Sequence, residues 1–199
     1  DVATLTLSQE VPVTPGQDTK QPMVIPLRLA LFDRESGRHH GERLVTLSEP
    51  QVQLSFGGFA AAPVLSLNRG FSAPVAIDAG LASADLVFLA AHDDDPFARY
   101  EAMQALVVQH LVAAVSGSMA AAARKAGRAA IATALGAVIA DPGLDDSMRG
   151  ELLILPAEAY LAEQLNLADP AAIREQREAL KAWLGQQLLG PLTALHDRV

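Results

Sequence analysis

The spacing of apolar residues changes once along this chain, and that change limits the folds open to it. Before Gly80, apolar side chains recur at every second position, as in Leu27 and Leu29. A period of two is typical of strands with one buried face. After Gly80 the apolar residues follow the longer period of a helix, as in Leu180 and Leu184. The sequence therefore predicts a multidomain chain with β structure first and α structure second.

The chain has 199 residues, half of them apolar, which is enough for two small domains with cores of their own. We place a β domain at residues 1–80 and an α-helical domain at residues 81–199. The first holds roughly six or seven short strands, which favours a two-sheet β-sandwich. Pro22 and Pro26 cannot donate a ladder hydrogen bond, so their strand is expected at a sheet edge or with a bulge. The polar residues 33–41 are expected to form a hairpin loop.

Start and stop signals divide the second domain into helices. Asp95 and Asp169 each precede a proline, and such an aspartate can cap a helix whose first position the proline occupies. Ser83 is expected to cap a shorter helix in the same way. The last helix is expected near Pro170 to Leu189, with leucines on one side. The second domain is therefore predicted to be an all-α array of helical hairpins.

Charge and composition argue against several classes of function. The net charge is −8 and neither half is basic, which argues against a nucleic-acid partner. The one basic cluster, residues 124–128, is expected to be a solvated helix face. The longest apolar run, residues 129–140, is too short to span a membrane, so we expect no membrane partner. The chain has no cysteine, which is compatible with a reducing compartment, and we expect a cytoplasmic protein.

His92 and the three aspartates at residues 93–95 have the residue types of a metal site. The spacing matches neither a calcium loop nor a zinc-binding helix, so helix capping is the preferred interpretation. A divalent-metal protein that uses these four side chains remains a third hypothesis. His39 and His40 are expected in a solvated loop, and His110 is expected to be a surface or a satisfied core residue.

We find no complete catalytic set in the sequence. Residues 70–74 come near the G-x-S-x-G pattern around Ser72, but Pro74 stands where the second glycine is required. No phosphate-binding loop and no His-Glu-X-X-His motif occur. We therefore assign no catalytic, cofactor-binding or metal-binding residue to this chain.

Several short motifs follow one another in a specific order. They are TPGQ at residues 14–17, RGFSAPV at 69–75, FLAAHD at 88–93, DPFARYEA at 95–102, ELLILP at 151–156 and ADPAAI at 168–173. In this order they resemble the bacterial aminopeptidase N family of zinc metallopeptidases, over essentially the whole chain. The resemblance implies an immunoglobulin-like β-sandwich at residues 1–80, followed by the start of a C-terminal helical domain that is truncated at its end.

The resemblance also implies where the chemistry of the parent protein lies. The zinc motif and the Gly-X-Met-Glu-Asn motif of the family belong to a thermolysin-like catalytic domain, and neither occurs here. Zinc is thus expected as a cofactor of the parent and not of this chain. The expected partner is the catalytic domain of the same parent chain, with peptide substrates only for the full-length protein. The junction between the domains is expected at Arg69, Phe71, Ser72 and Pro74.

By this resemblance the chain is a non-catalytic part of a zinc aminopeptidase. It would act as a spacer and as a wall of the chamber that limits the access of peptides to the zinc site, in a parent that releases N-terminal amino acids. The alternative is an independent protein-interaction scaffold, because alanine-rich helices permit concave stacks. A truncated helical domain is expected to leave Leu184 and Leu188 uncovered.

Overall fold

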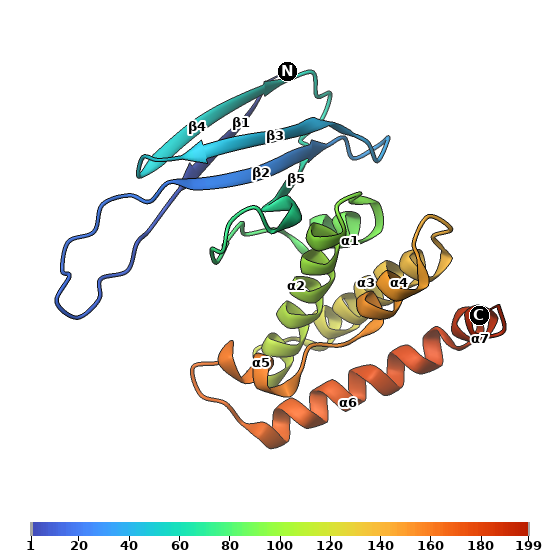
Figure 1. Cartoon of the computed structure of the whole chain (residues 1–199). Helices are drawn as coiled ribbons and strands as arrows, with labels where there is room; N and C mark the ends of the chain where they lie inside the picture. The colour runs from blue at the N-terminus through green and yellow to red at the C-terminus, as the bar shows by residue number, and fades with distance from the viewer. Residues whose placement is uncertain (1, 199) are drawn as a thin grey trace. The chain divides into compact units, whose positions relative to one another are not determined.

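The computed structural model describes residues 2–198 and contains two compact units, Asp1–Ala79 and Gly80–Val199 (Figure 1). The first unit holds strands and the second holds helices, which confirms the predicted β-then-α fold class. Residues 76–80, where the first unit gives way to the second, are exposed and have no regular secondary structure.

Five strands lie in the part of the first unit that the structure describes. They are β1 (Val2–Ser8), β2 (Ile25–Phe32), β3 (His39–Leu47), β4 (Gln51–Gly57) and β5 (Val64–Leu67), followed by the 3₁₀ turn η1 (Arg69–Phe71). β1 and β4 form one sheet, and the other sheet has the order β3-β2-β5. All of these strand pairs are antiparallel. The hairpin expected after Phe32 joins β2 to β3.

The core of the first unit is made by the inward side chains of both sheets. Leu27 and Leu29 of β2 and Leu47 of β3 are buried, and Leu7 of β1 packs in the same cluster. In β1 and β3 their neighbours along the strand are exposed, which is the alternation that the period of two predicts, whereas residues 30–32 of β2 are buried in succession. Burial of apolar side chains between the sheets therefore holds this unit together.

The expectation that the strand of the prolines lies at an edge or has a bulge is met by the second alternative. β2, the strand with Pro26, is the middle strand of its sheet, and its register shifts between Ala30 and Phe32. β5 pairs only with residues 29–32 of β2, so no strand lies beside Pro26 on that side. Pro22 lies outside any strand, in residues 9–24, which include three prolines and form a long connection. This connection explains why there are fewer strands than expected.

Seven helices lie in the described part of the second unit. They are α1 (Ser83–His92), α2 (Pro96–Val115), α3 (Ala121–Ala140), α4 (Asp146–Leu153), α5 (Glu158–Glu163), α6 (Pro170–Gln187) and α7 (Leu189–His196). None of these helices is long and apolar enough to cross a lipid bilayer.

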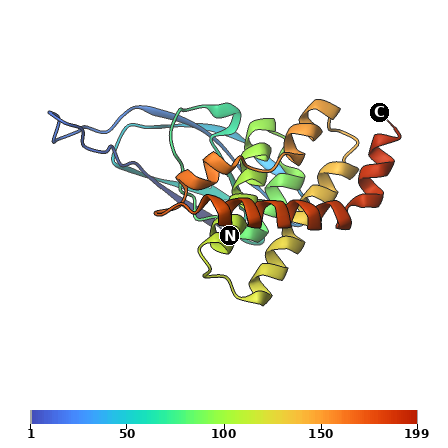
Figure 2. The same cartoon turned by 90° about the horizontal axis from the view of Figure 1, so that it is seen from below.

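The core of the second unit lies between α1, α2 and α3, and α6 runs across α2 and α3 (Figure 2). Met103 of α2, Ile131 and Val138 of α3 and Leu180 of α6 are all within 1% of complete burial. Ala134 of α3 is also fully buried, and such a small side chain lets helices approach closely. The stripe of apolar residues on each helix thus faces its neighbours.

Aspartates hold the starts of two long helices. The Asp95 carboxylate accepts a hydrogen bond from the Ala98 N–H at 2.8 Å, at the start of α2. The Asp169 carboxylate accepts from the Ala171 and Ala172 N–H groups at the start of α6. Ser83 does not cap α1 as expected, because the capping position belongs to Ala82 and Ser83 is already inside the helix.

The end of the second unit differs from the expectation of uncovered leucines. Leu184 and Leu188 are only 5% and 8% exposed. The chain turns after α6, and α7 packs against α3, where Gly136 lies beside Leu188. The exposed apolar side chains in this half of the chain lie elsewhere, with Leu167 at 89% and Leu189 at 65%.

Candidate functional site in the helical unit

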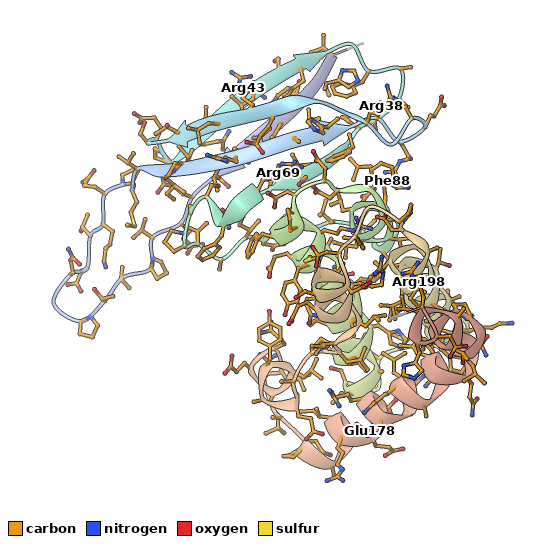
Figure 3. All side chains as sticks on the ribbon, turned by 45° about the vertical axis from the view of Figure 1, so that its right-hand side comes forward. Arg38, Arg43, Arg69, Phe88, Glu178 and Arg198 are labelled. Carbon is orange, nitrogen blue, oxygen red and sulfur yellow. The ribbon has the colours of Figure 1, made fainter. Side chains whose placement is uncertain are left out.

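The residues expected at the domain junction are used inside the first unit. Arg69 (Figure 3) is buried, and its Nε lies 3.0 Å from a carboxylate oxygen of Glu42 in β3. The Ser72 hydroxyl accepts a hydrogen bond from the Arg28 N–H and donates one to Asn68 Oδ1. Ser72 is therefore held as part of a corner beside β2, an arrangement unlike that of a free nucleophile.

Two further residues of this corner have other surroundings. Phe71 is 55% exposed, and its φ of 50° lies in the left-handed region. Pro74 is also exposed, directly after the buried Ala73. Asn68 has a left-handed backbone as well, and its side chain bonds the N–H and the carbonyl of Ala73. These contacts fix the corner within the first unit.

The carboxylates around His92 serve the helix ends. Asp93 is buried, and its Oδ1 accepts the Asp95 N–H at 2.9 Å, while Asp95 caps α2. His92 is exposed, and its ring packs on Phe88 at 4.8 Å between centroids. Throughout residues 2–198, no three His, Asp or Glu side chains come together to hold a metal ion. The residues present here thus do not fit a zinc site.

His39 and His40 lie in a strand and not in the loop where they were expected. They begin β3, where the Phe32 and His39 rings meet edge to face at 5.3 Å and His40 packs on Phe59 at 4.2 Å. The alternation of a strand sends the two side chains to opposite faces. A pair of ligands that point apart cannot bind one ion.

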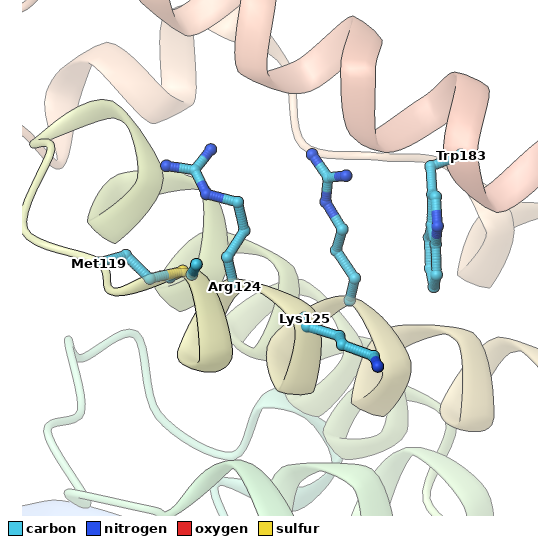
Figure 4. Close-up of a pocket in the computed structure, with 6 residues that line it drawn as sticks. Met119, Arg124, Lys125 and Trp183 are labelled. Atoms are coloured by element: carbon cyan, nitrogen blue, oxygen red, sulfur yellow. The ribbon is translucent and has the colours of Figure 1, made fainter.

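The strongest candidate for a binding site is a pocket of about 370 Å³ beside the start of α3 (Figure 4). Its lining, which we call the basic pocket, consists of Met119, Ala121, Arg124, Lys125, Arg128 and Trp183. All but Trp183, which comes from α6, lie on α3 or directly before it. Figure 4 shows Arg124 reaching from α3 toward α6 and Trp183 descending from α6.

The basic segment at residues 124–128 is thus not simply a solvated helix face. Lys125 is exposed, but Arg124 and Arg128 are half-buried and lie one turn apart on the same side of α3. Arg124 donates to Gln176 Oε1 of α6 at 2.7 Å. The Nε of Arg128 is enclosed and has no hydrogen-bond partner among the described residues.

A buried histidine lies close to these arginines. His110 of α2 is 5% exposed, and its Nδ1 has no partner within the described part of the chain. Burial lowers the pKa of His110, and the charges of Arg128 and Arg124 lower it further. His110 is therefore a core residue, but its Nδ1 lacks the hydrogen bond that was expected of a buried histidine. The arrangement favours a neutral imidazole next to two fixed cations.

Gly127 explains how α2 and α3 come so close at this point. A Cβ at Gly127 would lie 2.4 Å from His110 Nδ1, a distance that real side chains do not tolerate. The sequence signals of this site were an Arg-Lys-x-Gly-Arg segment and a single tryptophan. Neither indicates a pocket by itself, because more than fifty residues separate Trp183 from Arg128 along the chain.

Comparison with known proteins covers both units. Residues 1–80 match the family described as "Domain of unknown function (DUF3458) Ig-like fold". Residues 83–199 match the family described as "Domain of unknown function (DUF3458_C) ARM repeats". These descriptions support the predicted sandwich followed by a helical domain.

Several curated proteins and solved structures are similar to this chain. Aminopeptidase N of Escherichia coli (strain K12) is 32% identical over 206 residues, which cover 98% of this chain and 23% of that protein. Aminopeptidase N of Caulobacter vibrioides is 33% identical over 156 residues, covering 78% of this chain and 18% of that protein. The crystal structure of Legionella pneumophila aminopeptidase A in complex with aspartic acid has a TM-score of 0.80 at 22% identity, over 99% of this chain and 22% of that one. This chain therefore spans about a fifth of the length of these proteins.

Proposed function

The chain belongs to the aminopeptidase N family, and on that premise we propose that it is a structural spacer and chamber wall of a zinc aminopeptidase. One observation carries the proposal: relatives named aminopeptidase N match 98% and 78% of this chain but extend far beyond it. The catalytic domain of the same parent chain would be its partner. The parent would release N-terminal amino acids from peptides in the cytoplasm.

The side chains of this chain support a structural role. The polar groups that resemble catalytic residues form caps and corners, as Asp95 and Ser72 do. Zinc would be bound by the parent outside this chain, since the described residues offer no group of three ligands. A wall contributes shape and excludes water, while the metal in the catalytic domain would supply the Lewis acid.

Hydrolysis of an amino-acid anilide tests the non-catalytic part of the proposal. We expect the purified 199-residue chain to show no hydrolysis with or without added zinc, and the full-length parent to be active. Activity of the 199-residue chain that persists through a chelator and repeated purification would contradict the proposal.

The proposed role in limiting the access of peptides is tested by comparing how fast the full-length parent cleaves long peptides and dipeptides. We expect removal of the helical domain from the parent to raise the rate for long peptides relative to dipeptides, provided that zinc content is unchanged. An unchanged ratio in a zinc-loaded variant would exclude a role in peptide access.

A protein-interaction scaffold is the second candidate function. The description of residues 83–199 as ARM repeats favours it, because such helical stacks present extended binding surfaces. Specific capture of a stable partner other than the catalytic domain by the purified chain would support this function. Capture of the catalytic domain alone would support the wall function.

A further inference from the structure

The basic pocket is lined by three cationic side chains, Arg124, Lys125 and Arg128. Within residues 2–198, no carboxylate forms an ion pair with Arg124, Lys125 or Arg128. The chain as a whole carries a net charge of −8, so acidic side chains are not scarce. The positive charge of the pocket is therefore concentrated locally and left unneutralised.

The arginines that are almost fully buried differ from the half-buried Arg124 and Arg128. Three arginines among the described residues are at most 7% exposed, and each is paired with a carboxylate. The pairs are Arg69 with Glu42, Arg99 with Asp141 and Arg149 with Asp146. Since removing a charge from water is costly unless a partner compensates, this pairing is the expected state of a buried arginine. The half-buried Arg124 and Arg128 have no such carboxylate partner within residues 2–198.

The geometry of the pocket prepares it for an anion. Gln176 holds the Arg124 guanidinium through one donor at 2.7 Å, which orients the group and leaves its other donors available. Arg128 lies one turn further along α3 on the same side, with its Nε enclosed. A guanidinium group that is already ordered, as the hydrogen bond to Gln176 orders that of Arg124, loses little entropy when it binds an oxyanion.

The remaining walls of the pocket indicate what accompanies the anionic group. Met119 precedes α3 and Trp183 stands on the facing side of the pocket (Figure 4). A thioether and an indole offer apolar contact area and little hydration for a bare inorganic ion. A ligand with a negative group and an apolar part next to it satisfies both kinds of wall.

We propose that the basic pocket binds an organic carboxylate, with the charged group between Arg124 and Arg128 and its apolar part against Trp183. The carboxylate can come from a small molecule or from a peptide, since both present the same chemistry. The inference does not rest on the proposed function, because it concerns only contacts within the helical unit.

Fluorescence provides the test, because Trp183 is the only tryptophan of the chain. We expect 3-phenylpropanoate to change the emission of the 199-residue chain in a saturable way. We expect 3-phenylpropanamide, which has the same size without the charge, to bind about tenfold more weakly or not at all. The peptide Ala-Ala-Ala-Phe with a free carboxyl group, compared with 3-phenylpropanoate, distinguishes the two sources. Tighter binding of the peptide acid than of 3-phenylpropanoate assigns the pocket to peptides, and equal binding of the two acids assigns it to carboxylic acids in general.

Charge-removing variants locate the binding site. We expect Arg128→Gln and Arg124→Gln each to raise the dissociation constant of 3-phenylpropanoate about tenfold. Arg174→Gln is the matched control, because Arg174 is exposed on α6 and does not line the pocket. We expect Lys125→Gln, at an exposed position, to raise this dissociation constant by a smaller factor. It removes one positive charge from the pocket without a change in the buried contacts. Helical circular dichroism confirms that each variant is folded.

Several outcomes would overturn the proposal. Equal binding of the acid and the amide would show that charge is not recognised. Equal affinity of the chain and of the folded arginine variants would place the ligand elsewhere. Binding of inorganic phosphate without binding of 3-phenylpropanoate would show that the apolar wall has no role.

Discussion

Gly127 lies where α2 and α3 pack too closely to leave room for a side chain. We expect Gly127→Ala to destabilise the chain by about 1–3 kcal/mol, because a Cβ there meets the ring of the buried His110. Gly185→Ala on α6 is the matched control, since nothing lies within 4 Å of that Cβ. It should stabilise the chain by up to about 1 kcal/mol through helix propensity alone. Urea denaturation of both variants measures the difference, and the same sign for both would refute the close approach.

His110 makes stability depend on pH through its lowered pKa. The unfolded chain takes up a proton below about pH 6.5, whereas the folded chain resists it because of burial and the charges of Arg128 and Arg124. The unfolded state therefore binds more protons in this range, and stability falls as the pH decreases from about 6.5. One such group contributes at most about 1.4 kcal/mol for each pH unit.

The contribution of His110 is isolated by substitution. We expect His110→Gln to flatten the dependence of the unfolding free energy on pH between about 5 and 6.5. His196→Gln, at an exposed position in α7, should leave the pH dependence of the unfolding free energy the same as that of the unsubstituted chain. Identical slopes in the two variants would show that other groups cause the effect.

The starts of the helices differ in how they are held. We expect Asp95→Ala to cost about 0.5–2 kcal/mol, because the Ala98 N–H loses its acceptor at the start of α2. Ser83→Ala should change stability by less than about 0.5 kcal/mol, since Ser83 makes no capping bond. Thermal unfolding followed by circular dichroism compares the two. A larger loss for Ser83→Ala would mean that the start of α1 is held differently.

The elements that could be predicted from the sequence are those whose signals are local. The period of two around Leu27 predicts a strand, and the Asp-Pro pair at Asp95 predicts the start of a helix. Both signals involve only residues that are close together in the sequence, so they can be recognised without the fold. The position of β2 in the middle of a sheet with Pro26 in it depends on which residues β5 reaches, and no local pattern contains that information. The burial of Leu188 likewise depends on α3, about fifty residues earlier.

The basic pocket was missed for the same reason. Its charges come from residues 124–128 and its opposite wall from Trp183, two segments that only tertiary packing brings together. Locally, an Arg-Lys-x-Gly-Arg segment on a helix is most often solvated, and only the fold shows that two of its cations are half-buried. Prediction from a single sequence therefore reached the fold class but not the site.

At the scale of the whole molecule, we propose that the chain consists of two domains that meet near residue 80. Each compact unit has its own core, with Leu29 buried in the first and Ile131 in the second. The exposed residues 76–80 have no regular structure, and such segments are where proteases cut. Limited proteolysis should thus cleave there first.

The fragment from Gly80 onward should then keep its helices without the first domain. Its core is built from α1, α2, α3 and α6, all of which lie within the fragment. We therefore expect its helical circular dichroism per residue to exceed that of the whole chain and its thermal unfolding to stay cooperative. Two results would mean that the second unit needs the first in order to fold. One is that the protease cuts α2 or α3 earlier in the digestion than residues 76–80, and the other is that the fragment unfolds without a cooperative transition. In that case the boundary near residue 80 would mark a change of secondary structure and not a boundary between domains.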